Sequence, residues 1–228
     1  IFEFVKNYFY ERNIVKNKNL KALVTAGPTK EYLDPIRFIT NNSSGKQGYE
    51  IAKSLAKFGI ETTLISGPST LKKPENVNII KVETADQMYS ETKKILPVDI
   101  AVCTAAVTDF KPEKYEAKKI KKNNLNLNLK RNVDILEFLS KNNSQRPKLV
   151  VGFAAETNDI LKFANEKKNK KNCDWIIAND ISNPEIGFNS DYNSVSIIYD
   201  NKIEKIEKNL KSHIADKIVE KIVNNFIQ

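Results

Sequence analysis

The sequence predicts an α/β domain built on a doubly wound, mostly parallel β-sheet with helices on both faces. Strand-like apolar runs alternate with segments of helical spacing along most of the 228 residues, which is the pattern of repeated β-α-β units. The run VDIAVCTA at residues 98–105 is almost continuously apolar, as expected for a strand covered on both faces. The 7 glycines fall mostly beside strand ends or helix starts, where ligands bind in such sheets.

The individual elements follow from their local patterns. Strands are predicted at short apolar runs that end in glycine, proline or polar residues, namely residues 20–26, 62–66, 77–82, 98–105, 149–154 and 174–178. Helices are predicted where apolar residues recur every three or four positions, namely residues 49–56, 84–96, 133–139, 160–168 and 210–226. Thr84 with Gln87 forms a capping box, and Gly59 stands where a carboxyl-terminal cap is expected. His213 lies beside the apolar stripe of the last helix, which indicates a structural or surface role.

Two segments depart from this alternation. Residues 111–131 are polar and rich in lysine, and LNLNLK at residues 125–130 alternates like an exposed strand. Residues 195–206 form two short strand patterns around Asp200, which predicts a hairpin. Additions of this kind on a Rossmann-like core often form a lid or a subunit contact. We therefore expect a small β excursion for dimerisation and a lid loop.

The composition excludes several classes of site. Two cysteines are too few for a disulfide framework or a cysteine-rich zinc site, and one histidine nearly excludes histidine triads and multi-histidine metal centres. No stretch approaches the ~18 uninterrupted apolar residues of a membrane helix. The net charge of +9 favours anionic ligands, although lysine is abundant throughout. Chemistry here must use Lys, Arg, Asn, Asp, Ser, backbone amides or a bound cation.

Residues 1–19 are predicted to be a linker or the remnant of a preceding domain, and residues 20–228 the functional domain. Residues 1–19 have no basic start, long apolar centre or small-residue cleavage site, so they do not form a signal peptide. They also lack an initiator methionine, which suggests a longer natural protein. An arbitrary starting point would look the same.

The segment NNSSGKQG at residues 41–48 leads into a predicted helix. Ser43, Ser44 and Gly45 would lie where the amides of a helix start hold an anion. The segment is neither a GxxxxGK[ST] loop nor a GxGxxG turn, and by itself a Ser-Gly helix start is more often only a cap. Its significance depends on its neighbours.

Residues that suit an anionic substrate stand on both sides of this segment. A long loop after the first strand would place Arg37 and Asn41 beside the anion, where arginine binds carboxylate or phosphate and asparagine holds a carbonyl. Asp109 follows a strand and could accept ribose hydroxyls or help hold a cation. The ordinary alternatives are a surface ion pair for the arginine and turn or cap residues for the other two.

Two further segments add to the set. Four lysines surround Ile120 in KKIKK and could close on a polyphosphate, although a charge run is usually only solvated. The run from Gly152 to Glu156 ends a strand and could present backbone groups and the Phe153 ring to a base. Phe153 could equally belong to the core.

Taken in order, the motifs are TAGPT, LDPIRFITNNSSGKQG, AAVTDF, KIKK, GFAAET and ANDIS with GFNSD. This ordered set resembles phosphopantothenate–cysteine ligase, and more closely the ligase half of the bacterial bifunctional coenzyme A biosynthesis flavoprotein. The resemblance covers roughly residues 20–210. It implies a ligase that joins 4′-phosphopantothenate and L-cysteine with CTP, through a phosphopantothenoyl-cytidylate, releasing pyrophosphate and CMP.

The resemblance also assigns roles position by position. It implies catalytic roles for Asn41, which contacts the acyl-cytidylate, for Lys119, on a mobile loop over the triphosphate, and for Arg37, which can reach across a dimer. Arg37, Asn41 and Ala106 match substrate-binding positions. The nucleotide-binding positions are Gly27, Ser43, Ser44, Gly45, Ala105, Ala106, Asp109, Lys119, Phe153, Ala154, Ala155 and Glu156. Thr108 and Phe110 depart from the commoner small and tyrosine residues, which should matter little.

The resemblance further implies Mg²⁺ or Mn²⁺ as the cation, with metal ligands unassigned, CTP as co-substrate, and no FMN in this domain. It implies a cytoplasmic homodimer, possible fusion to a flavin-dependent decarboxylase, and no nucleic-acid or membrane partner. The hairpin at residues 195–206 and the strand at 125–130 are the candidate dimer contacts. Whether CTP is preferred over ATP stays open, because relatives elsewhere use ATP.

Two other readings of the sequence stay open. The first is an NAD(P)-dependent reductase on the same fold, which would want a glycine-rich turn directly after the first strand and a YxxxK motif. Neither is present. The second is a basic nucleic-acid-binding module, which predicts aromatic residues interleaved with the lysines. Only Tyr115 lies near the KKIKK segment.

Overall fold

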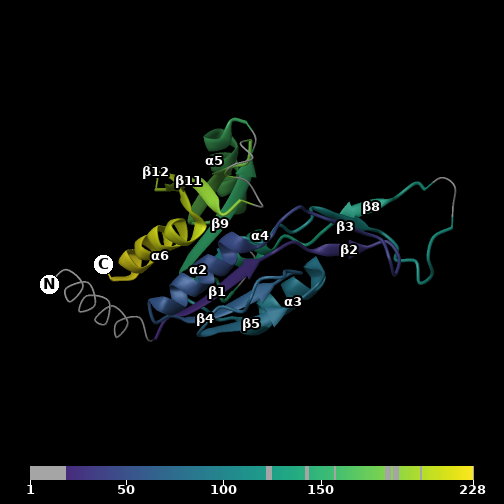
Figure 1. Cartoon of the computed structure of the whole chain (residues 1–228), viewed down its shortest axis with the longest axis horizontal. Helices are drawn as coiled ribbons and strands as arrows, with labels where there is room; N and C mark the ends of the chain where they lie inside the picture. Colours follow the sequence, from purple (N-terminus) through teal and green to yellow (C-terminus); the bar gives the residue numbers. More distant parts are fainter. Residues whose placement is uncertain are drawn as a thin grey trace.

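An eight-stranded β-sheet forms the centre of the protein (Figure 1). The structure, a computed structural model, describes residues 19–121, 125–141, 144–156, 158–182, 186, 190–200 and 202–227. The predicted linker at residues 1–19 lies outside these ranges except for its last residue. In spatial order the strands are β12 (Lys202–Leu210), β11 (Tyr192–Tyr199), β10 (Trp175–Asp180), β9 (Leu149–Glu156), β6 (Ile100–Cys103), β1 (Lys21–Ala26), β4 (Glu61–Ser66) and β5 (Val77–Lys81).

The sheet is mostly parallel, as predicted. Every neighbouring pair from β10 to β5 is parallel, and only β11 runs antiparallel to its neighbours β10 and β12. The chain passes from β1 outward to β4 and β5, then returns to place β6 on the other side of β1. The connections after β1 and β6 therefore diverge between these two central strands. Such a point is where ligands bind in doubly wound sheets.

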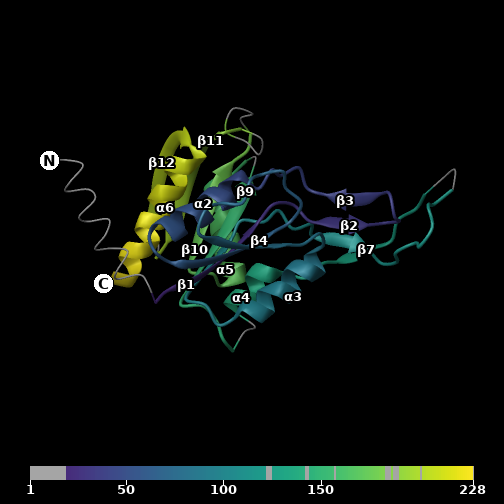
Figure 2. The same ribbon diagram turned by 60° about the horizontal axis from the view of Figure 1, so that its bottom comes forward.

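Helices cover both faces of the sheet (Figure 2). On one face α2 (Lys46–Lys57) and α6 (Lys211–Ile227) share an apolar core with the strands, in which Leu55 and Ile218 are fully buried. On the other face α3 (Ala85–Ile95), α4 (Ile135–Ser140) and α5 (Ile160–Lys171) contribute Met88, Leu139 and Ala164 to a second core. Burying these side chains on both faces fixes the layers around the sheet.

The local signals in the sequence mark the observed helix ends. Thr84 and Gln87 form the predicted capping box at the start of α3. Gly59 has a φ of 81° just beyond α2, a conformation that glycine adopts without strain. The strand predicted at 98–105 ends earlier, at Cys103, because the chain turns away there to line a cavity described below. His213 is exposed on α6, consistent with its predicted surface position.

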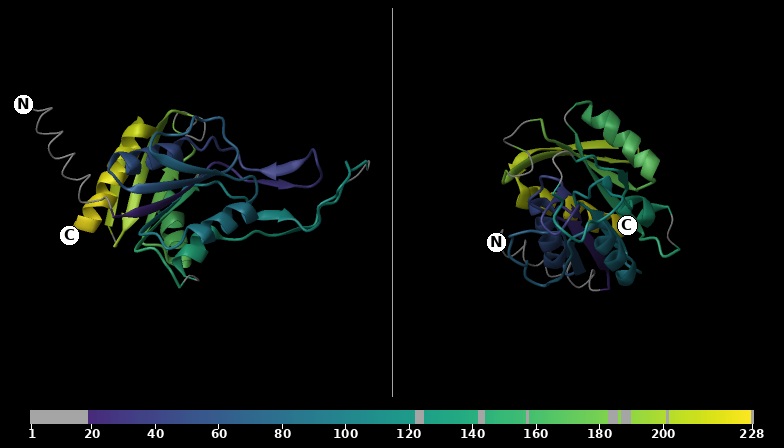
Figure 3. Two further views of the ribbon diagram at one scale, coloured as in Figure 1. Left: turned by 90° about the horizontal axis from the view of Figure 1, so that it is seen from below. Right: turned by 90° about the vertical axis from the view of Figure 1, so that its right-hand side faces the viewer.

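Two small antiparallel pairs project from the sheet as an arm (Figures 1 and 2). They are β2 (Lys30–Tyr32) with β3 (Phe38–Thr40), and β7 (Phe110–Pro112) with β8 (Leu129–Arg131). We call residues 30–40, 110–121 and 125–131 the arm. Figure 3 shows it at the opposite end of the molecule from the carboxyl terminus. The arm is thus an outgrowth of the connections that leave β1 and β6.

Two predictions made from the sequence differ from the structure of the arm. The segment between the first strand and its helix, predicted as a loop, contains the β2–β3 hairpin. The exposed strand predicted at residues 125–130 is limited to Leu129–Arg131, because only these residues pair with β7. Part of the predicted lid loop, residues 122–124, lies outside the described ranges.

The hairpin predicted at residues 195–206 is present as β11 and β12, but it is not a separate excursion. β11 pairs with β10, so the hairpin extends the main sheet. Its outer strand β12 is mostly exposed and carries alternating Lys and Glu, which discourages further strand pairing. None of the helices in the described ranges is both long enough and apolar enough to span a membrane.

Candidate active site

A cavity of about 1000 Å³ lies at the carboxyl ends of β1, β6, β9 and β10, where α2 begins. It occupies the switch point between β1 and β6, the position that the topology favours for a ligand. Most of the residues predicted to form the site line it, namely Asn41, Ser43, Ser44, Gly45, Ala105, Ala106, Asp109, Phe153, Ala154 and Ala155. The fold therefore brings together segments that lie more than 100 residues apart along the chain.

Close backbone packing holds the start of α2 at the cavity. Gly45 has a φ of 79°, and a Cβ there would lie 3.0 Å from the Gly27 nitrogen. A Cβ on Gly48 would lie 2.2 Å from Thr104 Oγ1, so only glycine lets the first turn of α2 approach β1 and the end of β6. Gly27 itself does not line the cavity but packs beneath Gly45. The first turn of α2 is thereby placed with its amide end toward the cavity, which favours an anion.

Asn41 joins two loops at the mouth of the cavity. Its Nδ2 donates to the carbonyl oxygens of Ala106 (3.1 Å) and Val107 (3.2 Å). The segment before α2 is therefore tied to the segment that follows β6. Asn41 is exposed, so its side chain is accessible to a substrate.

Helix α5 brings lysines into the cavity that the sequence analysis did not single out. Lys167 donates to the Phe153 carbonyl oxygen at 2.8 Å, and Lys171 pairs with Asp134 (2.6 Å) and Glu137 (3.1 Å). Burial lowers the pKa of Lys171, but its hydrogen bonds to these two carboxylates more than offset this and raise it. The available signal in the sequence was the i, i+4 spacing of these two lysines on a helix that follows the predicted strand at residues 149–154. It was obscured by the abundance of lysine.

Asn179, at the end of β10, adds an unusual polar group. Its Oδ1 is buried in the cavity lining and has no hydrogen-bond partner among the described residues. A buried acceptor without a partner is costly, so a donor from a bound ligand would stabilise it. In the sequence, Asn179 is marked only by its place after the predicted strand at residues 174–178.

Four predicted residues lie outside the cavity lining of their own chain, namely Gly27, described above, and Glu156, Arg37 and Lys119. Glu156 ends β9, where its carbonyl oxygen accepts from the Ile181 amide. Arg37 and Lys119 lie on the arm. The expectation that Arg37 sits beside the anion site is wrong within a single chain, because the β2–β3 hairpin carries it away from α2.

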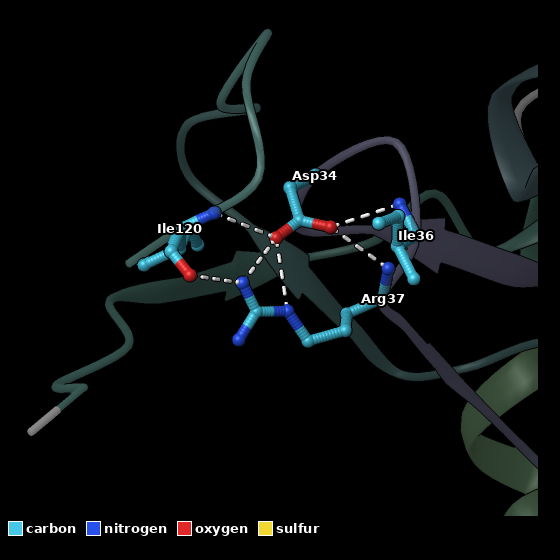
Figure 4. A network of polar contacts seen from close by, with 4 residues as sticks. All are labelled: Asp34, Ile36, Arg37 and Ile120. Atoms are coloured by element: carbon cyan, nitrogen blue, oxygen red, sulfur yellow. Dashed lines mark hydrogen bonds and ion pairs between the residues drawn. The ribbon is translucent and has the colours of Figure 1, made fainter. Parts of the chain in front are cut away.

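Arg37 instead belongs to a network around Asp34 (Figure 4). The Asp34 side chain is fully buried and accepts from the Ile36 and Arg37 amides at 2.9 Å each, from the Arg37 guanidinium at 2.5 and 2.9 Å, and from the Ile120 amide at 3.1 Å. Arg37 also donates to the Ile120 carbonyl oxygen at 2.7 Å. The network ties the hairpin turn to the segment that contains Lys119.

Burial alone would raise the pKa of Asp34, but the hydrogen bonds from Arg37, Ile120 and Ile36 lower it well below its ordinary value. A carboxylate with a lowered pKa contributes stability that is fully present above its unfolded pKa and is lost as the pH falls through the native value. The network therefore stays intact at neutral and mildly acidic pH.

Replacing Asp34 by asparagine is expected to release the segment around Lys119. An amide cannot accept at both positions, and Arg37 would lose its counter-charge. We expect trypsin to cleave after Lys118, Lys119 or Lys121 roughly tenfold faster or more in Asp34→Asn. The matched control is Asp86→Asn, which removes an exposed partner of Lys111 at the arm and should change cleavage little. Equal cleavage of Asp34→Asn and wild type would show that the network does not order the segment.

The cavity suits a cation that is held mainly by a substrate. No group of three or more His, Cys, Asp or Glu side chains able to hold a metal occurs in the described part of the chain. Asp109 is exposed in the lining and offers one carboxylate. One or two carboxylates together with substrate phosphates are the usual ligands of protein-bound Mg²⁺. The residues present thus fit a nucleotide-bound Mg²⁺.

Comparison with known proteins agrees with this geometry. The profile of the family described as "DNA/pantothenate metabolism flavoprotein C-terminal domain" matches residues 17–226. The chain belongs to this family.

The chain is similar to curated proteins over almost its whole length. It is 39% identical over 224 residues to the coenzyme A biosynthesis bifunctional protein CoaBC of Borreliella burgdorferi, covering 96% of this chain and 56% of that protein. It is 37% identical over 219 residues to the protein of the same name from Vibrio vulnificus strain YJ016, covering 94% and 54%. The chain therefore spans about half the length of these relatives.

A solved structure that the chain resembles has the same fold. The crystal structure of the C-terminal domain of a coenzyme A biosynthesis bifunctional protein CoaBC matches with a TM-score of 0.77 at 33% identity. The match covers 92% of this chain and 96% of that one. The expected resemblance and α/β fold are confirmed.

Proposed function

We propose that residues 20–228 form a phosphopantothenate–cysteine ligase. The observation that carries the proposal is the cavity in which the start of α2, Asn41 and the ends of β6 and β9 meet, in a chain of this family. The names of the curated relatives, which describe a bifunctional enzyme of coenzyme A biosynthesis, support it. Because the chain spans about half of those proteins, we assign it the ligase step and no other activity.

The reaction has two chemical steps. The carboxylate oxygen of 4′-phosphopantothenate attacks the α-phosphorus of CTP, and the bond from this phosphorus to the bridging oxygen breaks and releases pyrophosphate. The cysteine nitrogen then attacks the acyl carbon and loses a proton, and the bond from this carbon to the phosphate oxygen breaks and releases CMP. Activation is needed because a free carboxylate would have to expel oxide.

The residues of the cavity fit these steps. The amides and hydroxyls of Ser43, Ser44 and Gly45 would hold phosphate oxygens, and the strand-end backbone at Ala105 and Phe153 would bind the base. Mg²⁺ bound to the triphosphate would neutralise part of its charge. Asp109, which lines the cavity, would supply a protein carboxylate as a ligand. The unpartnered Oδ1 of Asn179 would accept from a ligand donor.

The arm supports a homodimer. Seven of the eleven large hydrophobic side chains that are exposed in the described residues lie on it, namely Ile36, Phe38, Phe110, Tyr115, Leu125, Leu127 and Leu129. Such a concentration of exposed apolar surface is typical of a contact with another chain. Because Arg37 and Lys119 lie on the same arm, we propose that it carries them toward the cavity of a second copy. The arm, rather than the β11–β12 hairpin, is then the main dimer contact.

The experiment is a comparison of pyrophosphate release from CTP and from ATP, with phosphopantothenate present and cysteine present or omitted. We expect release from CTP in both cases, limited to about one turnover without cysteine, and amide product with CMP only when cysteine is added. Faster release from ATP would show that ATP is the preferred co-substrate and would leave the proposed ligase activity unchanged. No release from either nucleotide would contradict the proposed function.

A further inference from the structure

Lys211 is a lysine buried in the cavity wall, and the proposed chemistry has not yet used it. It is the first residue of α6, only 6% of it is exposed, and it lines the cavity together with Lys46. Its backbone is fixed at both ends, because its amide donates to the Asp191 carbonyl oxygen at 2.8 Å and its carbonyl oxygen accepts from Gln47 Nε2 at 3.2 Å. The start of α6 is therefore held against the first turn of α2.

A lysine at this place is unfavourable for the fold. Neither α2 nor α6 has an acidic residue in its first turn, and both begin with lysine, although the amino-terminal end of a helix favours negative charge. The pKa of Lys211 is lowered to about 8, first by burial and then by the nearby Lys46, with Asp191 partly opposing both. Asp191 itself is exposed and pairs with Lys46 at 2.7 Å. Residues that break local rules of stability are typical of functional sites.

We propose that Lys211 binds a phosphate group of a substrate beside Ser43, Ser44 and the first turn of α2. The inference rests on the proposed function, because it takes the ligand of the cavity to be phosphorylated. A bound phosphate would supply the negative charge that both helix starts lack. The phosphate group belongs either to the nucleoside triphosphate or to the phosphorylated acid, and both present the same chemistry to an ammonium group.

The proposal predicts that phosphate binding changes the protonation of Lys211. An anion beside Lys211 favours its charged form and raises its pKa. Near pH 8, where part of the Lys211 population is neutral in the free protein, phosphate binding should take up a fraction of a proton. Among the described residues, the charged groups that shift the pKa of Lys211 are Lys46 on α2 and Asp191 before β11, and these two form an ion pair. The proton uptake should therefore be assigned mainly to Lys211.

The test is titration calorimetry at pH 8 with pyrophosphate, CTP and phosphopantothenate, each in two buffers of different ionisation enthalpy. We expect Lys211→Met to weaken one or more of these ligands by roughly 10- to 100-fold and to abolish the proton uptake. Lys211→Arg should bind within severalfold of wild type but without proton uptake, because arginine does not titrate. The ligand that loses affinity identifies which phosphate Lys211 binds.

The controls separate folding from binding. Lys217→Met removes an exposed lysine of the same helix and should leave affinity and proton uptake unchanged. The melting temperature of Lys211→Met, measured on the same samples, shows whether the variant is folded. If Lys211→Met fails to fold, absence of proton uptake in Lys211→Arg is the decisive result.

Two outcomes keep this inference distinct from the proposed function. Wild-type affinity and proton uptake in Lys211→Met would overturn the role of Lys211 even if the chain makes amide product. Proton-coupled binding of pyrophosphate that depends on Lys211, in a chain without CTP or ATP turnover, would uphold Lys211 and contradict the ligase.

Discussion

Asn41→Asp is expected to release pyrophosphate while forming amide at least about a hundredfold more slowly than wild type. Asn41 Nδ2 donates to two backbone carbonyl oxygens, those of Ala106 and Val107. A carboxylate has no hydrogen to donate, so it would repel both carbonyl oxygens and loosen the segment after β6. Its charge would also oppose the negative charge that develops when cysteine attacks the acyl carbon.

The activation step should be less affected, because the phosphates are held in our proposal by the start of α2 and by lysines rather than by Asn41. The measurement is a rapid-quench assay in which pyrophosphate, acyl-cytidylate and amide are determined in the same samples. Asn78→Asp, on the exposed side of β5, makes the same change in charge outside the cavity and should behave as wild type. Amide formation by Asn41→Asp at the wild-type rate would show that the assigned role is wrong.

Lys119→Gln is expected to reduce pyrophosphate release by about a hundredfold or more, because a cation that stabilises the triphosphate during transfer is lost. Lys119 is exposed on the arm and does not line the cavity of its own chain. Lys114→Gln, another exposed lysine of the arm, is the matched control and should retain most of the activity. Undiminished pyrophosphate release from Lys119→Gln would contradict the role of this residue.

Mixed dimers test which cavity Lys119 serves. We expect Lys119→Gln and Asn41→Asp chains, co-expressed, to recover about a quarter of the wild-type amide formation. Random pairing makes half of the dimers mixed, and each mixed dimer has one cavity with an intact Asn41 and an intact partner arm. If each Lys119 acts in its own chain, the mixture should instead stay as inactive as the two variants measured separately.

The sequence determined the layers of the fold and part of the residues that line the cavity. The strands and helices were predictable because each rests on a local pattern, such as the capping box of Thr84 or the apolar stripe of α6. Glycine positions and motif order pointed to one edge of the sheet, and Asn41, Ser43 and Gly45 do lie there. These signals are local, so each strand or helix can be predicted from its own residues.

Only the tertiary structure shows that the arm forms, that lysines of α5 line the cavity and that Lys211 is buried. The strands β2 and β3 have three residues each, too few for a periodic signal. Their turn depends on hydrogen bonds that Asp34 accepts from Arg37 and from Ile120, which lies 86 residues away. Lys211 meets the first turn of α2 across 164 residues of chain. In a chain rich in lysine, composition cannot distinguish a buried cation from a solvated one. Burial and neighbouring charge make that distinction, and both arise only when distant segments pack together.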